Sequence, residues 1–212
     1  MVEGSKSVGE LMGSKIPLEK VFYTKGFQLA QQNEIWEEVS AVEMRRISHL
    51  DTPSPVLALA QLPQPLSPNP LESILVLDNL QDPGNVGTLI RSAAWFGIKQ
   101  IICTPETADP FGTKAVQSAM GNLFHVNIIY DDLQDALTPW KGHIYAALLQ
   151  GELPQKPKAP YALIIGNEGN GIRTELLPPF HPICIPGHGH AESLNAGVAG
   201  SILLYHLQCV GK

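Results

Sequence analysis

The sequence predicts an α/β protein with a mostly parallel sheet covered by helices on both faces. From residue 71 onward, short apolar runs typical of buried strands alternate with segments of helical periodicity, and this alternation favours a parallel sheet. Before it, four prolines between residues 63 and 70 form a stretch that cannot enter a sheet interior. We therefore expect a small α/β unit over residues 1–62, a Pro-rich linker over 63–70 and a second domain over 71–212.

The first unit shows four element signals. Val8, Leu11 and Met12 indicate a short helix, and residues 20–24 and 56–60 read as strands. Ser40 and Glu43 have the spacing of a capping box, which predicts a helix beginning there.

The second domain is predicted to contain six strands and four helices. The strands are expected at 74–77, 100–103, 124–129, 144–148, 161–165 and 181–185, and the helices at 83–96, 109–120, 132–137 and 194–209. The last helix carries Ala196, Gly197, Ala199 and Gly200 on its early turns. These small residues suit either close packing on the sheet or a subunit interface.

Three loops that follow buried strands carry polar residues. In the first, Asp82 before Pro83 is a strong helix start, with Asn85 in the first turn and Arg91 further along the same helix. Such a strand, loop and helix N-terminus can bind a ligand at the edge of an α/β sheet. Taken alone, the pattern also fits a capped helix with a solvated arginine.

The second loop reads Gly166-Asn167-Glu168-Gly169-Asn170-Gly171. Its glycine order is Gly-x-x-Gly-x-Gly, whereas a dinucleotide fingerprint needs Gly-x-Gly-x-x-Gly, so a classical NAD site is not supported. The sequence also lacks a Gly-Lys-Ser/Thr phosphate loop. By itself, this loop is more typical of a plain turn with an exposed carboxylate at Glu168.

The third loop runs from Ile185-Pro186 to Ser193-Leu194-Asn195. Ser193 is in a position to cap the last helix, and it lies outside any Gly-x-Ser-x-Gly elbow, which argues against a serine hydrolase. The nearby histidines and Cys184 match no zinc spacing, so we expect no metal.

Composition sets the wider bounds. The chain has 212 residues, a formal net charge of −6 and three scattered cysteines, which we expect to be reduced and mostly buried. No apolar run reaches membrane-spanning length and no signal peptide is evident. We expect a cytoplasmic protein with no membrane association. This net charge is not typical of a nucleic-acid-binding protein, so any RNA contact must rely on a local basic patch.

Together the three loops resemble a known family. The patterns Asp82-Pro-x-Asn85-x-Gly87-x-x-x-Arg91-x-Ala93, Gly166-Asn-Glu168-Gly169-x-Gly171 and Ile185-Pro186 with Ser193-Leu194-Asn195 are similar, in order, to the three motifs of the SpoU-like (TrmH-type) branch of the SPOUT RNA methyltransferases. The likeness covers about residues 72–207, and the first 60 residues resemble that family's small substrate-binding domain. Three departures are Gly187 where relatives usually have methionine, Gln117 where many have arginine, and the missing basic lead and first strand that usually precede the Glu-Gly of the small domain. We therefore expect a small domain that is trimmed or incomplete at its start.

The resemblance implies a C-terminal trefoil knot, a homodimer formed through the catalytic domain, and methyl transfer from S-adenosyl-L-methionine to a ribose 2′-hydroxyl of ribosomal or transfer RNA. The implied catalytic residues are Asn85, Arg91, Glu168, Ser193 and Asn195. The implied cofactor-binding residues are Gly166, Asn167, Glu168, Gly169, Ile185, Pro186, Ser193 and Leu194.

The residue types fit this chemistry. A guanidinium stays protonated in proteins, so we expect Arg91 to clamp an RNA phosphate and stabilise the forming alkoxide rather than act as a base. Asn85 and Glu168 would hold the guanidinium group of Arg91 in place. Ser193 and Asn195 would orient the cofactor and the ribose. The alternatives are a non-catalytic RNA- or cofactor-binding member of the same fold and, more remotely, a nicotinamide-dependent oxidoreductase.

Overall fold

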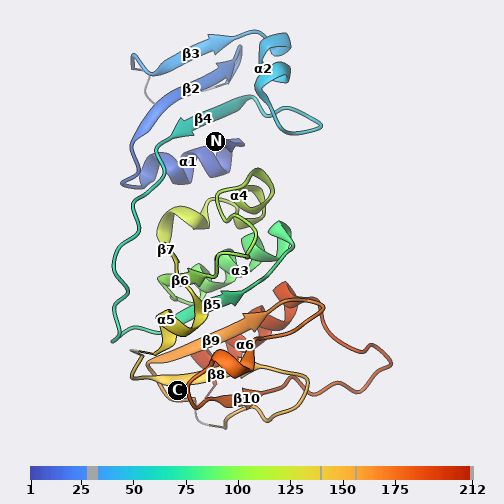
Figure 1. Cartoon of the computed structure of the whole chain (residues 1–212). Coiled ribbons are helices and arrows are strands. Elements are labelled where there is room, and N and C mark those ends of the chain that lie inside the picture. The colour runs from blue at the N-terminus through green and yellow to red at the C-terminus, as the bar shows by residue number, and fades with distance from the viewer. Residues whose placement is uncertain (28–32, 139, 156, 211–212) are drawn as a thin grey trace.

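The computed structural model describes residues 1–27, 33–138, 140–155 and 157–210. Within these ranges the chain forms a four-stranded sheet from its first sixty residues and a six-stranded sheet from the remainder (Figure 1). Between them, residues 61–69 run without regular structure, where the prolines predict an extended linker. No helix among the described residues is long and apolar enough to cross a membrane.

The four-stranded sheet has the order β1-β4-β2-β3. Its elements are β1 (Val2–Glu3), α1 (Ser5–Gly13), β2 (Leu18–Thr24), β3 (Trp36–Val39), α2 (Ala41–Ile47) and β4 (Val56–Ala60). The predicted capping box is present, because Ser40 and Glu43 each accept a hydrogen bond from the other's backbone N–H. The sequence did not reveal β1, which has two residues, or β3, which contains two glutamates and no continuous apolar run.

The six-stranded sheet is parallel throughout, in the order β10-β8-β9-β5-β6-β7. Its strands are β5 (Ile74–Asp78), β6 (Gln100–Cys103), β7 (Asn127–Tyr130), β8 (His143–Ala147), β9 (Tyr161–Gly166) and β10 (His181–Ile183). The chain builds outward from β5 through β6 to β7 and then crosses to the other side of β5. The strand order therefore reverses between β5 and β9, which is where open α/β sheets bind ligands.

Helices cover both faces of this sheet, which confirms the predicted fold class. Leu75 and Leu77 face the core under α3 (Pro83–Trp95), α4 (Thr113–Ala119) and α6 (Ala196–Cys209). Ile74 and Val76 face the opposite core under α5 (Leu133–Leu137). This alternation is the period of two that a strand imposes on its side chains.

Several predicted boundaries were wrong. The helix expected at 109–120 spans only Thr113–Ala119, because Asp109 Oδ1 accepts the Phe111 N–H in a preceding turn. The strand expected at 124–129 begins at Asn127, since Asn122–His125 forms a 3₁₀ helix. The strand expected at 181–185 ends at Ile183, and the last helix begins at Ala196 rather than at residue 194.

The small residues of α6 serve packing within the chain. A Cβ at Gly200 would overlap Leu89 of α3, and one at Gly197 would lie 3.1 Å from Asn85 Oδ1. Glycine at these positions lets the two helices approach closely. The opposite face of α6 is different, because Ile202 and Tyr205 are 39% and 55% exposed.

The two sheets are joined by side-chain contacts as well as by the linker. His49, just after α2, lies with Nδ1 3.0 Å from Thr113 Oγ1 at the start of α4. Glu10 of α1 lies 3.0 Å from His125 Nε2. These contacts place α1 beside the 3₁₀ helix Asn122–His125, and the loop after α2 beside the start of α4.

Candidate active site at the ends of β5 and β9

The first two motifs meet at the carboxyl ends of β5 and β9. Asp78, the last residue of β5, pairs in register with Gly166, the last residue of β9. The loops that follow these residues carry Asp82 and Asn85 on one side and Glu168 on the other. The reversal of strand order thus brings together residues more than eighty positions apart in the chain.

The start of α3 is held by Asp82. Its Oδ1 accepts the Asn85 N–H at 2.8 Å, and its Oδ2 pairs with Lys114 Nζ at 2.9 Å. The ion pair with Lys114 and the hydrogen bond from Asn85 hold the pKa of Asp82 below its ordinary value. The predicted helix start is confirmed, and Asn85 lies in the first turn with its side chain nearly buried.

A direct hydrogen bond joins the first motif to the second. Asn85 Nδ2 donates to Glu168 Oε1 at 2.9 Å, and the Gln81 N–H lies 3.5 Å from Glu168 Oε2. The carboxylate is therefore oriented from the first loop although its backbone belongs to the second. A plain turn with a free glutamate is the wrong description of this loop.

The second loop has a fixed backbone shape. A Cβ on Gly166 would lie 2.5 Å from the Gly171 carbonyl, and Gly171 has a φ of +72° that other residues rarely adopt. Asn167 Oδ1 accepts the Gly169 and Asn170 N–H groups at 2.8 and 2.9 Å. Its Nδ2 donates to the Asn79 carbonyl at 2.9 Å. The motif's glycines and Asn167 together determine where Glu168 lies.

Sequence reasoning missed two residues at this point. Asp78 is fully buried, and Arg173, just beyond the second motif, pairs with its carboxylate. The hydrogen bond to Asp78, together with the charge of that carboxylate, raises the pKa of Arg173. The signal available in the sequence was an acidic residue at the end of an otherwise apolar strand, which needs a partner when buried.

The third motif is more open. The segment between β10 and α6 projects from the body of the protein (Figure 1). Within it, Ile185 packs against the core, whereas Pro186, Ser193 and Leu194 are exposed. Ser193 does not take the alternative role of capping the last helix, because Asn195 is the cap and its Oδ1 accepts the Val198 N–H at 3.2 Å.

Arg91 lies on another side of α3. It is exposed, and within the described residues it forms no hydrogen bond or ion pair, so Asn85 and Glu168 do not hold its fork as predicted. It lines an open groove of about 740 Å³ between α1, α3 and α6. The other lining residues include Lys6, Thr88, Trp95, Ser201, Ile202 and Tyr205. Trp95 is 82% exposed, so one wall of this groove is apolar and uncovered.

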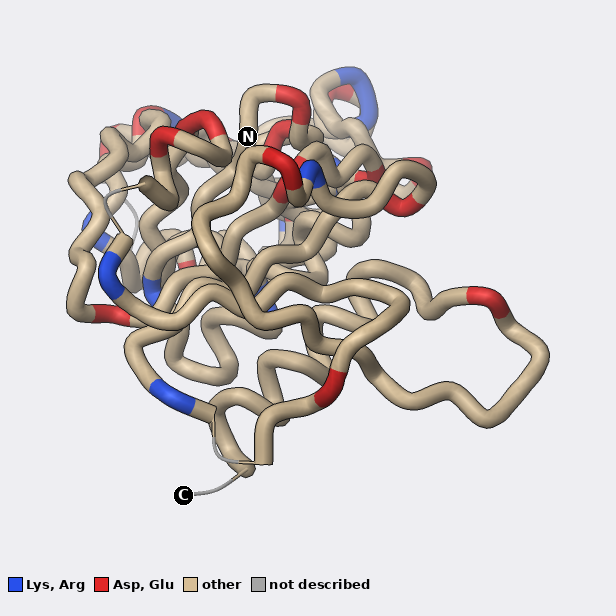
Figure 2. Tube along the Cα trace, turned by 60° about the horizontal axis from the view of Figure 1, so that its bottom comes forward, with Lys and Arg blue, Asp and Glu red and all other residues tan. Residues whose placement is uncertain are grey.

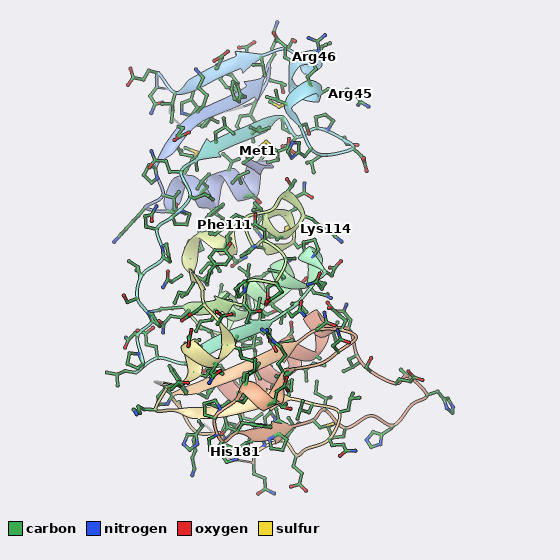
Figure 3. All side chains as sticks on the ribbon, in the orientation of Figure 1. Met1, Arg45, Arg46, Phe111, Lys114 and His181 are labelled. Atoms are coloured by element: carbon green, nitrogen blue, oxygen red, sulfur yellow. The ribbon has the colours of Figure 1, made fainter. Side chains whose placement is uncertain are left out.

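Charged residues are dispersed over the chain, with basic segments in several separate places (Figure 2). Arg45 and Arg46 form a small basic group in the last turn of α2. They lie on the same side of the molecule as Lys114 of α4 (Figure 3). The His49–Thr113 contact joins the loop after α2 to the start of α4. Arg45, Arg46 and Lys114 are thus exposed cations on one side of the molecule, and Lys114 is already paired with Asp82.

Neither thiols nor metal ligands mark a second centre among the described residues. Cys103 is buried, and its burial together with Asp109 raises the pKa of its thiol to about 12, so it is a poor nucleophile. Cys209 is exposed, contrary to the expectation of mostly buried cysteines. No group of three or more His, Cys, Asp or Glu side chains in the described ranges is arranged to hold a metal ion.

Comparisons with known proteins agree with this geometry. Residues 72–205 match the model of the SpoU rRNA Methylase family. The chain is 34% identical over 171 residues to 23S rRNA (guanosine(2553)-2′-O)-methyltransferase RlmP of Bacillus subtilis, and the match covers 76% of this chain and 68% of that protein.

Two solved structures are similar over almost the whole chain. A protein of the TrmH family from Porphyromonas gingivalis has a TM-score of 0.85 and 32% identity, covering 98% of this chain and 88% of the other. An AdoMet-bound rRNA methyltransferase from Sinorhizobium meliloti has a TM-score of 0.82 and 28% identity, covering 97% and 85%. With the motifs and their meeting point at β5 and β9, these matches establish that the chain belongs to the SpoU rRNA methylase family.

Proposed function

We propose that this protein is an S-adenosylmethionine-dependent RNA methyltransferase that methylates a ribose 2′-hydroxyl of ribosomal or transfer RNA. The observation that carries the proposal is the Asn85–Glu168 hydrogen bond, which joins the first two family motifs at the reversal of strand order. RlmP, whose name specifies 2′-O-methylation of 23S rRNA, supports the choice of the ribose hydroxyl.

The residues present suit this cofactor. Gly166 and Gly171 let backbone come close where a side chain would intrude, and Glu168 supplies a negative charge beside them. We assign cofactor binding to Gly166, Asn167, Glu168, Gly169, Ile185, Pro186, Ser193 and Leu194. S-adenosylmethionine supplies, when bound, a methyl group on a positively charged sulfur. The chain's own task is to bind and orient the reactants and to stabilise the charge that develops on the acceptor oxygen.

Five residues are assigned to catalysis. Arg91 remains a cation and makes no competing ion pair among the described residues, so its fork is available to an RNA phosphate and to the forming alkoxide. Asn85 orients Glu168, and Asn195 fixes the start of α6 against the first motif. Ser193 lies on the exposed loop, from which it can reach a bound ribose.

We further propose that the chain works as a homodimer joined through α3 and α6. The exposed apolar side chains Trp95, Val198, Ile202 and Tyr205 lie on these two helices. Contiguous exposed apolar surface of this kind marks an interaction site. A knotted C-terminus is supported by the path of α6, which follows the edge strand β10 yet packs on α3 and β9 in the middle of the domain.

The first unit, residues 1–62, is proposed to bind RNA, with residues 63–70 as linker and 71–212 as the catalytic domain. Arg45 and Arg46 are two exposed cations of this unit, on the same side of the molecule as Lys114 (Figure 3). Phosphate contacts from such a patch add affinity without base specificity.

Calorimetric titration with S-adenosylmethionine and its demethylated product, with NAD as control, tests the cofactor. Binding of the first two and not of NAD is expected. Methylation assays on unmodified ribosomal and transfer RNA, followed by mass spectrometry of nucleosides, then separate an enzyme from the alternative, a non-catalytic binder. A 2′-O-methylated nucleoside is the expected product. Methylation of a base instead would refute the proposed acceptor.

A further inference from the structure

The buried carboxylate of Asp78 has a single described partner residue. Arg173 donates its backbone N–H to Oδ2 at 3.0 Å and its Nε–H to Oδ1 at 2.9 Å, and its Nη2 also contacts Oδ1. Both carboxylate oxygens are thus satisfied by one residue, among the residues that the structure describes. Because a buried charge without a partner is strongly destabilising, Asp78 and Arg173 act as a unit.

This ion pair connects three loops at the same edge of the sheet. Asp78 ends β5, Arg173 follows the second motif, and Glu106 in the loop after β6 lies 3.5 Å from Arg173 Nη2. The cofactor residues Gly166 to Gly169 lie between the two ends of the loop that Asp78 holds. At one end, Gly166 pairs in register with Asp78, and at the other Arg173 returns to the same carboxylate.

We propose that Arg173 is a positioning residue for S-adenosylmethionine, an inference that rests on the proposed function. By closing residues 167–172 onto Asp78, it holds the loop in the shape that brings Glu168 to Asn85 and leaves Gly169 and Asn170 bonded to Asn167. Its guanidinium faces Asp78 and Glu106, so its effect on the cofactor passes through the loop.

The test measures the Kd of S-adenosylmethionine by calorimetry. Arg173→Met is expected to raise the Kd at least about tenfold, because the loop loses the guanidinium contacts that hold it to Asp78. Arg173→Lys keeps the charge but not the fork, so it should recover only part of the affinity. Lys20→Met is the matched control, since it removes an ion pair with Glu37 at 2.8 Å in the other sheet and should leave the Kd unchanged.

A double variant separates positioning from stability. Asp78→Asn combined with Arg173→Met leaves no unpaired buried charge, so it should regain much of the Tm that Arg173→Met loses. The loop still lacks the guanidinium contacts with Asp78, so the Kd should stay raised and the Gly169 and Asn170 amides should exchange hydrogen faster than in the wild type. If Arg173→Met does not fold, this variant and Arg173→Lys carry the test.

The outcomes distinguish the two levels of inference. A double variant with wild-type Kd and amide exchange would show that Arg173 serves stability alone and would overturn the positioning role. The same holds if Arg173→Met folds and binds like the wild type. If the wild-type protein binds no S-adenosylmethionine, the proposed function fails and this inference fails with it.

Discussion

The close approach of α3 and α4 at Gly87 gives a quantitative prediction. A Cβ at this position would overlap the Ala115 carbonyl oxygen and lie 2.6 Å from Ser118 Cβ. Gly87→Ala gains about 1 kcal/mol of helix propensity. Forcing an extra carbon against a neighbouring helix costs up to about 3 kcal/mol, because the obstructing oxygen is backbone and cannot rotate away. The net loss of unfolding free energy should be about 2 kcal/mol, or roughly 4–8 °C in Tm.

Urea denaturation and thermal melting measure this loss. Gly9→Ala is the matched control, because Gly9 lies inside α1 and a Cβ there would meet nothing within 4 Å. The control should gain up to about 1 kcal/mol. If Gly87→Ala proved as stable as the wild type, the two helices would not be held as closely as the structure indicates.

Three further predictions concern charged residues. Lys114 lowers the pKa of the Asp82 carboxylate, so ionised Asp82 stabilises the folded protein at neutral pH. This contribution should begin to fall as the pH drops below the ordinary pKa of 3.8, and it should be lost once the pH has passed through the lowered pKa of the folded protein. Asp82→Asn keeps a capping side chain and should flatten that part of the pH dependence in urea titrations, by less than about 1 kcal/mol because the pair is exposed. Arg91→Lys should lower turnover about 10²- to 10³-fold in a methylation assay, by analogy with lost oxyanion contacts, and near-full turnover would exclude the fork as the essential feature. Replacing Arg45 and Arg46 with glutamine should weaken RNA binding. It should also reduce the slope of the logarithm of the binding constant against the logarithm of the salt concentration by about 2. An unchanged slope would exclude both residues as phosphate contacts.

The sequence predicted the elements of the parallel sheet well because local signals agreed. The apolar run before Asp78 could only be a buried strand, and Asp82 before Pro83 marks a helix start that the structure confirms. Boundaries failed where a side chain decided them. Asn195 rather than Ser193 became the cap of α6, because both residue types can cap and only the three-dimensional path selects one.

The contacts of the site could be predicted only in part. Motif similarity indicated that Asn85 and Glu168 belong to one site, but not that they bond directly. The Asp78–Arg173 pair was missed because its partners are 95 positions apart, and no local pattern records such a distance. An acidic residue closing a buried strand is the kind of feature that demands a long-range partner.

Arg91 presents a geometric problem that a single chain does not solve. It lies six positions after Asn85 on α3, which places it about 9 Å along the axis and about 240° around the helix. Asn85 faces Glu168, so Arg91 faces away from that carboxylate and into the groove beside α6. If both residues serve the same reaction, we infer that Arg91 completes the site of a second copy docked on the exposed face of α3 and α6.

Subunit mixing tests this inference. Arg91→Ala and Glu168→Ala should each be nearly inactive alone. In mixed dimers, the Arg91→Ala subunit keeps Glu168 and receives Arg91 from its partner, so one site in two is complete. Random mixing should therefore restore about a quarter of the wild-type activity per dimer. If Arg91 acted within its own subunit, every site in every mixed dimer would lack one residue. Absence of recovery, with dimer exchange verified independently, would then locate Arg91 in the site of its own chain.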